Sequence, residues 1–316
     1  MGHRANLVLV EPGGWRLFYS RWAANGIYRS LVVGPDATAS FVTAQEAQDP
    51  VHGWLDDVWA EGGLVMDLPA RRLTWFGNDL VEDLATRRAA FALLAQTWSG
   101  WSLEWAYDGL GDLAASVGVD RAVVRVLDLE ELTYGPVEDD EVERLVRSPE
   151  EDLPVNRQGG YQLLTVRAAD TTAAWVLERP GVGAHLAWHG PALLERLPGP
   201  GRDRVRLGAI PMAGLHLDLA QRQAGIWTAE TCPGLLPALD DLWPGWQTSF
   251  WGDDYERQVS SADGAVELPA CDVTAAFAGL AARLLPGMWN RPGPVDLARL
   301  ARALVTVDDA LADKDP

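Results

Sequence analysis

The chain has 316 residues, of which 48% are hydrophobic, and a formal net charge of −19. That hydrophobic content can bury a core, which excludes a globally disordered chain, and no run approaches the roughly 18–20 apolar residues of a membrane helix. A surface this acidic repels phosphate backbones and anionic lipid headgroups, so we expect neither nucleic-acid nor membrane binding. It would attract a basic protein or a cationic ligand, although many proteins are acidic simply to remain soluble.

The N-terminus and the cysteines indicate the cellular compartment. The first six residues lead directly into the apolar run Leu7–Val10, which is far shorter than the apolar region of a signal peptide. We therefore expect a cytoplasmic protein. Cys232 and Cys271 are its two cysteines, and in a cytosolic chain such residues are expected to stay reduced. Since there is no CxxC pair, a structural zinc or redox site has no support.

The first half of the chain is predicted to contain a hairpin, a helix, a second hairpin, a second helix and a strand. These elements are expected over residues 7–22, 37–47, 63–76, 83–97 and 102–107. Gly34-Pro35 breaks the chain before the first helix. Asp79 or Asp83 is expected to cap the second helix.

The same order returns in the second half. A hairpin, a strand, a helical stretch, a second hairpin, a helix and a final strand are expected over 161–177, 184–188, 192–197, 214–227, 233–242 and 247–251. Gly214–Leu219 matches Gly63–Leu68 at four of six positions, with an offset of 151 residues. The Trp-x-Gly-Trp of 98–101 returns at 243–246 with an offset of 145, and a Gly-Pro pair returns with an offset of 156. Landmarks that recur in the same order at similar offsets predict a repeated structural unit.

The predicted fold class is α+β and internally duplicated, with two copies of a mostly antiparallel hairpin–helix–hairpin–helix–strand unit followed by C-terminal helices. The first copy, an acidic connector, the second copy and the C-terminal helical segment are expected over 1–134, 135–160, 161–270 and 271–316. The connector is predicted to carry one short helix at 142–146. Amphipathic helices are expected at 272–285 and 294–311.

Two groups stand out among the 15 tryptophans of the chain. Trp98, Trp101, Trp243 and Trp246 recur at the helix-to-strand corner of both halves, so we expect them to pack those corners. A second group occurs in the first half among arginines and tyrosines: Trp15, Trp22, Trp54, Trp59 and Trp75, with Arg4, Arg16, Arg21, Arg29, Tyr19 and Tyr28. Aromatic rings beside arginines are typical of a stacking pocket or a protein-binding hot spot. The alternative is that these rings close a large core.

Known catalytic and cofactor motifs are missing from the sequence. It contains no Walker A motif, no GxGxxG after a strand, no HExxH, no GxSxG and no EF-hand loop. We therefore expect no cofactor, and the catalytic residues of any enzyme remain unidentified. His185 and His189 have the spacing of a helical metal pair, but in the strand predicted there they would lie too far apart to hold one ion. We expect no metal site.

Two carboxylates stand out by position. Asp108 and Asp253 each follow the second tryptophan of a Trp-x-Gly-Trp by seven residues. A carboxylate that is repeated after a strand is interpreted as a helix cap or, alternatively, as a paired functional acid.

Polar residues also gather at the start of the first hairpin. Arg4 and Asn6 share one face of the first strand, and Tyr19 and Arg21 share one face of the second. The four would line one pocket if the hairpin register allows it. The second copy lacks this polar set, which favours a division into one scaffold half and one functional half. The alternative is an ordinary exposed edge.

The leading hypothesis is a non-catalytic acidic binding protein, most concretely an immunity- or antitoxin-like inhibitor of a basic protein. The alternative is an enzyme or sequestering protein of small-molecule, specialised metabolism, with an aromatic- and arginine-lined pocket in the first copy. A subunit or regulator of a larger assembly is a third hypothesis. The candidate ligand- or partner-binding residues are Arg4, Asn6, Tyr19, Arg21, Trp22, Trp54, Trp59 and Asp108.

Overall fold

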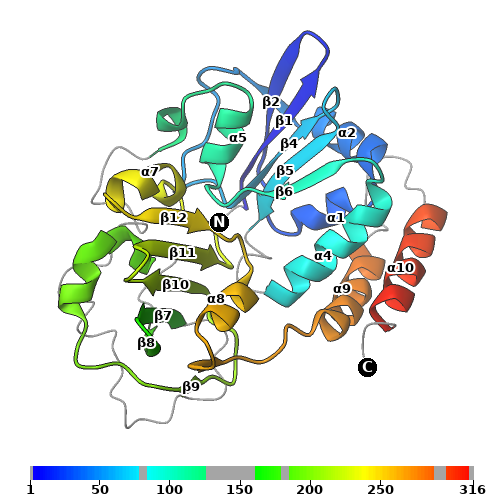
Figure 1. Cartoon of the computed structure of the whole chain (residues 1–316). Coiled ribbons are helices and arrows are strands. Elements are labelled where there is room, and N and C mark those ends of the chain that lie inside the picture. The colour runs from blue at the N-terminus through cyan, green and yellow to red at the C-terminus, as the bar shows by residue number, and fades with distance from the viewer. Residues whose placement is uncertain (1–2, 78–83, 126–160, 179–184, 288–296, 313–316) are drawn as a thin grey trace. The chain divides into compact units, whose positions relative to one another are not determined.

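The computed structural model describes residues 3–77, 84–125, 161–178, 185–287 and 297–312 (Figure 1). It mixes helices and strands, as expected for an α+β protein. The chain forms two compact units. Unit 1 comprises Met1–Leu127 together with Cys271–Pro316, and unit 2 comprises Asp128–Ala270.

Unit 1 is built on a six-stranded sheet in the order β3-β2-β1-β4-β5-β6. The strands are β1 (Ala5–Glu11), β2 (Gly14–Ser20), β3 (Glu46–Gln48), β4 (Gly62–Asp67), β5 (Arg72–Gly77) and β6 (Ser102–Trp105). The hairpins β1–β2 and β4–β5 are antiparallel, and β2 pairs with β3 in the same sense. The pairs β1–β4 and β5–β6 are parallel.

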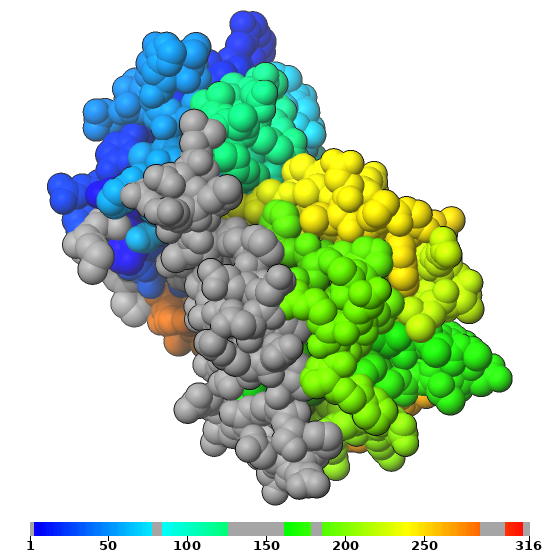
Figure 2. Space-filling view, turned by 90° about the vertical axis from the view of Figure 1, so that its left-hand side faces the viewer, coloured from blue at the N-terminus to red at the C-terminus, as the bar shows by residue number. Residues whose placement is uncertain are grey.

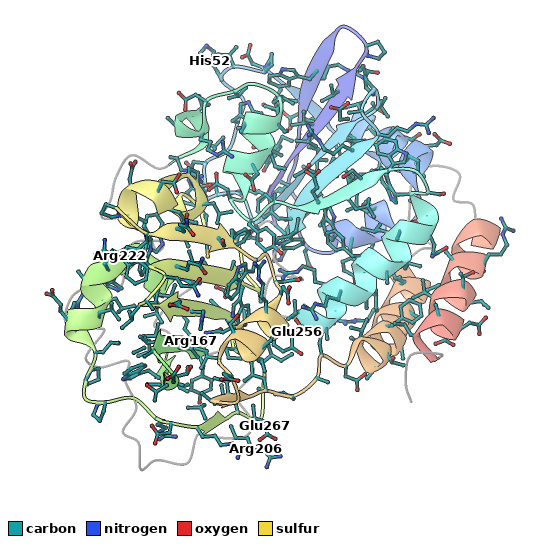
Figure 3. The ribbon with its side chains drawn as sticks, in the orientation of Figure 1. His52, Arg167, Arg206, Arg222, Glu256 and Glu267 are labelled. Atoms are coloured by element: carbon teal, nitrogen blue, oxygen red, sulfur yellow. The ribbon has the colours of Figure 1, made fainter. Side chains whose placement is uncertain are left out.

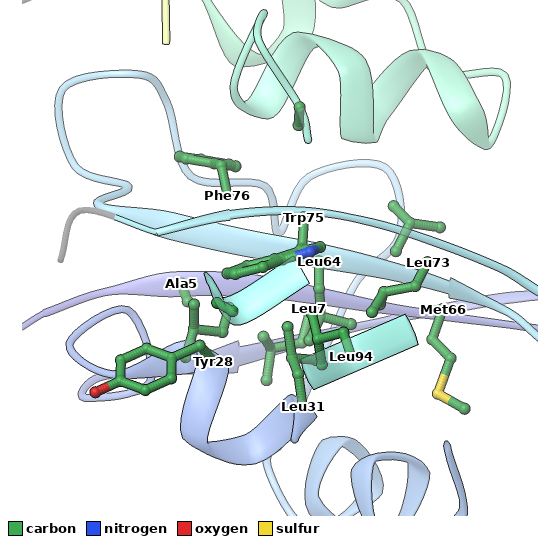
Figure 4. Close-up of a cluster of buried hydrophobic side chains, with 14 of the residues drawn as sticks. Ala5, Leu7, Tyr28, Leu31, Leu64, Met66, Leu73, Trp75, Phe76 and Leu94 are labelled. Carbon is green, nitrogen blue, oxygen red and sulfur yellow. The ribbon is translucent and has the colours of Figure 1, made fainter. Parts of the chain in front are cut away.

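Helices cover both faces of this sheet. They are α1 (Ile27–Leu31), α2 (Pro35–Thr43), α4 (Leu84–Thr97), α5 (Leu110–Ser116), the 3₁₀ helix η1 (Arg121–Val124), α9 (Val273–Gly287) and α10 (Leu297–Ala312). Leu7, Leu64 and Trp75 share one face, where they meet Leu31 of α1 and Leu94 of α4 (Figure 4). The helix α5 packs on β4 and β5, and α9 and α10 pack against α4 (Figure 1).

Unit 2 is built on a five-stranded sheet in the order β12-β11-β10-β7-β8. The strands are β7 (Tyr161–Ala168), β8 (Thr171–Glu178), β10 (Ala213–Asp218), β11 (Gln223–Thr228) and β12 (Gln247–Phe250). A separate parallel pair joins β9 (Val205–Arg206) to β13 (Val266–Glu267). Arg206 and Glu267 face each other there, with 3.2 Å between Nε and Oε1 (Figure 3).

In the described part of unit 2, three helices accompany the sheet: η2 (Leu186–Arg196), α7 (Leu235–Leu242) and α8 (Tyr255–Ser261). The helix α7 lies beside η2, as the yellow and yellow-green surfaces in Figure 2 show. Leu186 and Leu193 of η2 share a buried cluster with Leu235 and Leu239 of α7. The helix α8 packs on β10 and β11.

Five strands of unit 1 and the five strands of the larger sheet in unit 2 have the same spatial order and the same directions. The series β2-β1-β4-β5-β6 corresponds to β8-β7-β10-β11-β12, with antiparallel, parallel, antiparallel and parallel pairs in turn. The hairpin turns also match, since Arg71 and Arg222 both have φ of 50°. Gly100 and Gly245, which precede the last strand of each series, have φ of 79° and 77°.

The tryptophan corners are packed as the sequence predicts. Trp98 is 1% exposed, and its Nε1 donates to the Leu31 carbonyl over 2.7 Å. Trp243 is also 1% exposed, and its Nε1 donates to the Ala187 carbonyl over 2.9 Å. Each of these rings meets a second, half-buried indole edge-on, so each corner holds one buried tryptophan with its Nε1 bonded and a second ring packed against it.

Two details of the predicted fold need correction. The sheets are mixed rather than mostly antiparallel, because the antiparallel hairpins join one another through parallel pairs. The strand expected at 184–188 is not formed, and residues from Leu186 onward are in η2. His185 caps η2, with its Nδ1 accepting the Ala187 amide over 3.0 Å, and that local bond competes with a strand.

The predicted domain boundaries stay predictions. The structure does place two helices close to the predicted C-terminal pair, and Phe277, Leu280 and Val307 of these helices belong to the core of unit 1. The helix caps expected at Asp79 or Asp83, and the short helix expected at 142–146, lie outside the described residues.

Candidate functional site

One end of the unit 1 sheet gathers most of the chemically distinctive side chains. Because β1 and β4 are parallel and begin at this end, while β2, β5 and β6 finish there, the segments before and after these strands converge. The converging segments are His3–Arg4, Arg21–Trp22, the loop 49–61 and the stretch 106–125.

Two tryptophans at this end are largely open to solvent. Trp22 is 59% exposed and Trp59 is 54% exposed. The Arg4 guanidinium lies 4.5 Å from the centroid of the Trp59 ring, and the Arg21 guanidinium lies 5.6 Å from that of Trp22. Val58 and Val123 are further exposed apolar residues here. We call the surface formed by Arg4, Arg21, Trp22, Val58, Trp59 and Val123 the tryptophan face.

A chain of contacts connects the two indoles. The His3 ring centroid lies 6.4 Å from that of Trp22, and His3 Nδ1 lies 2.6 Å from a Glu61 carboxylate oxygen. The Glu61 amide donates to the Arg4 carbonyl over 3.0 Å, and Arg4 covers Trp59. The two rings are therefore held on one connected framework.

The loop 49–61 is anchored along its length. Trp54 Nε1 donates to the Pro50 carbonyl over 3.0 Å. The Leu55 amide donates to the side-chain oxygen of Asn6 over 2.8 Å. His52, at the outer part of the loop (Figure 3), has its amide bonded to Asp49 over 2.8 Å. Since both ends and the middle are bonded, the loop presents Trp59 in a defined place.

An ionic network lies beside this loop, and we call Asp57, Asp108, Asp112, Arg121 and Arg125 the ionic cluster. Arg125 Nη1 lies 2.6 Å from Asp57 Oδ2, and its Nη2 bonds to Asp108 Oδ1. Arg121 bonds to Asp108 Oδ2 over 2.8 Å and to Asp112 Oδ1 over 3.0 Å. The Asp108 and Asp57 side chains are buried, at 0% and 3% exposed, whereas both arginines reach solvent.

Burial perturbs the ionisation of the cluster. It raises the pKa of Asp57 to about 6, against the attraction and hydrogen bond of Arg125, and the neighbouring Asp108 and Asp56 carboxylates raise it further. Burial also raises the pKa of Asp112. Burial alone would lower the pKa of Arg121, but its bonds to Asp108 and Asp112 outweigh this and raise that pKa.

Gly111 makes room for the cluster. A Cβ atom at this position would collide with the Asp108 carboxylate and with the Arg125 guanidinium. A side chain in the first turn of α5 would therefore displace the ion pairs, which explains why glycine is suited to this position.

The corresponding end of the unit 2 sheet is closed by uncharged hydrogen bonds. Gln258 of α8 is fully buried, and its Nε2 lies within 3.1 Å of the Leu163 carbonyl, the Leu215 carbonyl and Thr165 Oγ1. Its Oε1 accepts Trp227 Nε1 over 2.5 Å. Thr165 also bonds to His216 Nδ1 over 2.9 Å, and burial lowers the pKa of His216 to about 4.

His185 and His189, which have the sequence spacing of a metal pair, each lie within hydrogen-bond distance of other protein groups. His185 is fully buried, with Nδ1 accepting from Ala187 and Nε2 3.1 Å from the Trp227 carbonyl, so it is the neutral Nε2–H tautomer. His189 lies 3.1 Å from Arg196. Within the described ranges, no three His, Cys, Asp or Glu side chains are grouped to hold a metal ion. None of the described helices is long and apolar enough to cross a membrane.

The predicted hairpin residues are only partly brought together. Asn6 and Tyr19 are directly opposite in the β1–β2 register. Asn6 is fully buried beneath the loop at Leu55, while the two arginines lie beyond the strands and each covers a different indole. Trp54 packs against Trp15 with 6.0 Å between ring centroids.

The cap interpretation of Asp108 and Asp253 is wrong. The Asp108 carboxylate bonds to Arg121 and Arg125, and Gly109 occupies the cap position of α5. In unit 2 the cap is the next residue, Asp254, whose side chain accepts the Arg257 amide over 3.0 Å. The capping geometry needs a residue immediately before the helix, and both predicted residues lie one position too early.

Sequence reasoning missed Asp57, Asp112, Arg121 and Arg125. Their partners are up to 68 residues away in the chain, as for Arg125 and Asp57, so no local pattern connects them. The available signals were the spacing of four between the two arginines and between Asp108 and Asp112. No protein-family model, curated protein or solved structure matches this chain.

Proposed function

We propose that this chain is a non-catalytic acidic binding protein that engages a protein partner through the tryptophan face. Its most concrete form is an immunity- or antitoxin-like inhibitor of a basic protein. One observation carries the proposal: two indoles, each more than half exposed, lie at the same end of one sheet with an arginine over each ring.

Exposed indoles of this kind favour protein recognition. Tryptophan and arginine are enriched among the residues that contribute most to protein–protein binding. An arginine over one face limits the motion of the ring, so less conformational freedom is lost when a partner covers the other face. Val58 and Val123 extend the apolar surface around Trp59.

The charge of the chain supports a basic partner. Of the net −19, residues 128–160 contribute −8, from eleven carboxylates and three arginines. Such a field accelerates the encounter with a basic protein and weakens as salt rises. Near the tryptophan face the charges are mixed, with Arg4 and Arg21 beside Asp56 and Glu61, so short-range contacts there would be both aromatic and ionic.

The proposal includes an internal duplication. The shared strand order, the matching φ angles at Arg71 and Arg222, and the matching corners at Trp98 and Trp243 support descent of both units from one ancestral unit. In this account unit 1 carries the binding surface and unit 2 keeps the scaffold.

A small-molecule function is the second candidate, favoured by one observation. Asn6 is fully buried and its Nδ2 has no hydrogen-bond partner among the residues that the structure describes, so a ligand acceptor would satisfy it. An enzyme or sequestering protein would lose activity or binding on Arg4→Ala without unfolding. A protein inhibitor would tolerate Tyr19→Phe.

The test is native mass spectrometry of the tagged chain purified from extracts of its host at low and high salt. We expect a stoichiometric basic protein that departs as salt rises, and that is lost from the Trp22→Ala/Trp59→Ala double variant. Val305→Ala, which trims a 62%-exposed side chain on α10, is the matched control and should keep the partner. Equal capture by the double variant and wild type, or retention of a small molecule alone, would overturn the proposal.

A further inference from the structure

We propose that the ionic cluster is a proton-dependent clasp that positions Trp59 and Val123 on the tryptophan face. This inference rests on the proposed function for its biological meaning, but the clasp can be observed without any partner. It is carried by the bonds that connect the cluster to the two turns, and by the burial of Asp57 between them.

The clasp joins two segments that are far apart in sequence. The Asp57 amide donates to the Val124 carbonyl over 3.0 Å, and its carboxylate holds Arg125 over 2.6 Å. Val58 and Val123 are the residues next to this backbone bond. The two exposed valines are therefore placed by the same residues that make the ion pair.

Trp59 is two residues from Asp57 and shares its turn. Asp56 Oδ1 accepts the amides of Val58 and Trp59, each over 3.0 Å. These bonds tie Trp59 to the turn that holds Asp57, so a movement of the buried Asp57 carboxylate is expected to displace the Trp59 ring. From the other side, Asp108 bonds both to Arg125 and to Arg121, which is the first residue of η1.

Asp57 is the group of the cluster that can take up a proton. Its carboxylate is buried and bonded to Arg125, which also bonds to Asp108. The groups that face Asp57 are Arg125, Asp108 and Asp56, and those that face Asp112 are Asp108 and Arg121. Burial, the largest effect on Asp57, raises its pKa to about 6.

The direction of the pH effect follows from that shift. In the open state Asp57 is hydrated and its pKa returns toward 3.8. The closed state therefore binds the proton more tightly, so the clasp closes more firmly as pH falls through about 6 and loosens as pH rises. Between pH 7.5 and pH 5.0 the opening equilibrium constant is expected to fall about tenfold.

Hydrogen exchange tests the clasp directly. Exchange of peptides covering 54–61 and 119–125 would be measured by mass spectrometry at pH 5.0 and 7.5 for wild type and Asp57→Asn. The asparagine is neutral at both pH values, and comparing the two proteins in one buffer cancels the intrinsic pH dependence of exchange. The ratio of wild-type to variant exchange rate should be about tenfold higher at pH 7.5 than at pH 5.0.

The control is Asp240→Asn, an exposed aspartate on unit 2 bonded to Thr248 over 3.1 Å, which should leave exchange in both peptides unchanged. A wild-type to Asp57→Asn ratio that stays within twofold between the two pH values would overturn the clasp. If Asp57→Asn fails to fold by circular dichroism, the same peptides in wild type are compared with β1–β2 amides in the same sample. A tenfold relative change then supports the clasp, and one within twofold rejects it.

Failure of the clasp and failure of the proposed function are distinguishable. With a captured partner, Asp57→Asn should remove the pH dependence of affinity, whereas Trp59→Ala should remove most of the affinity at both pH values. A partner that binds independently of Trp59 would contradict the proposed function and leave the exchange result standing.

Discussion

The same end of two similarly ordered sheets is finished in two chemically different ways. In unit 1, Leu113 of α5 packs behind Gly63, and the ionic cluster combines the buried Asp57 and Asp108 with arginines that are partly open to water. In unit 2, Gln258 of α8 occupies the place behind Gly214 and is fully buried, with every side-chain polar atom bonded.

The difference indicates where function is expected. A buried amide that satisfies carbonyls and an indole fixes a structure but offers nothing to a partner. Exposed indoles gain free energy only when something covers them, and the guanidinium groups of the ionic cluster reach solvent. This contrast supports the proposal that unit 1 carries the recognition surface and unit 2 keeps the scaffold.

The largest predicted effect comes from replacing Gln258 of unit 2 by leucine, the residue type that unit 1 has at Leu113. Gln258→Leu removes four hydrogen bonds and leaves the Leu163 and Leu215 carbonyls and Trp227 Nε1 buried without that partner. We expect unit 2 to lose about 3–4 kcal/mol of unfolding free energy. Urea-dependent hydrogen exchange of the β10–β11 peptides measures it, and a loss below about 1 kcal/mol would show that the amide is dispensable.

Gly111→Ala is expected to have the next largest effect, and it acts on unit 1. The new methyl collides with Asp108 and Arg125, so the cluster must shift, at about 2 kcal/mol. Gly279→Ala on α9 is the control: its Cβ meets nothing, so it should stabilise by about 0.5–1 kcal/mol. Urea unfolding of both variants would measure these changes, and equal effects would argue against a crowded cluster.

The tryptophan corners of the two units should respond alike to the same substitution. Trp98→Phe removes a bond to the Leu31 carbonyl, and Trp243→Phe removes one to the Ala187 carbonyl, each leaving a small void. Each should cost its own unit about 2 kcal/mol. Unit-resolved hydrogen exchange reads both, and a difference greater than about 1 kcal/mol would mean that the corners are not equivalent.

The two units should respond oppositely to acid. The pKa of His216 is lowered from 6.5 to about 4, so the unfolded state takes up a proton first, and unit 2 loses about 2 kcal/mol between pH 7 and pH 5. Asp57, with its pKa raised to about 6, adds about 1 kcal/mol to unit 1 over the same range. His216→Asn and Asp57→Asn should each abolish the trend of their own unit, as read by urea unfolding at the two pH values.

The local elements of the fold were predictable from sequence. Apolar runs around turn chemistry predicted the hairpins β1–β2 and β10–β11 within a few residues, and helical periodicity predicted α4 and α9. The parallel pairing of β1 with β4 was not predictable, because it joins segments about 57 residues apart and leaves no periodic trace.

The residue types of the candidate site were predictable from sequence, but the contacts between those residues were not. Trp22, Trp59 and the neighbouring arginines were identifiable because aromatic residues and arginines cluster in the first half, but periodicity could not tell exposed rings from buried ones. The clasp escaped prediction since Asp57 lies in an irregular loop and Arg125 lies beyond a short 3₁₀ turn.

Hydroxyl-radical footprinting of the intact chain, free and in a low-salt extract of its host, tests the central claim most directly. Oxidation of tryptophan side chains is read by mass spectrometry, residue by residue. The account predicts that Trp22 and Trp59 are oxidised readily in the free chain and at least about threefold less in the bound one, with unit 2 unchanged. Protection confined to unit 2, with both indoles oxidised as in the free chain, would contradict it.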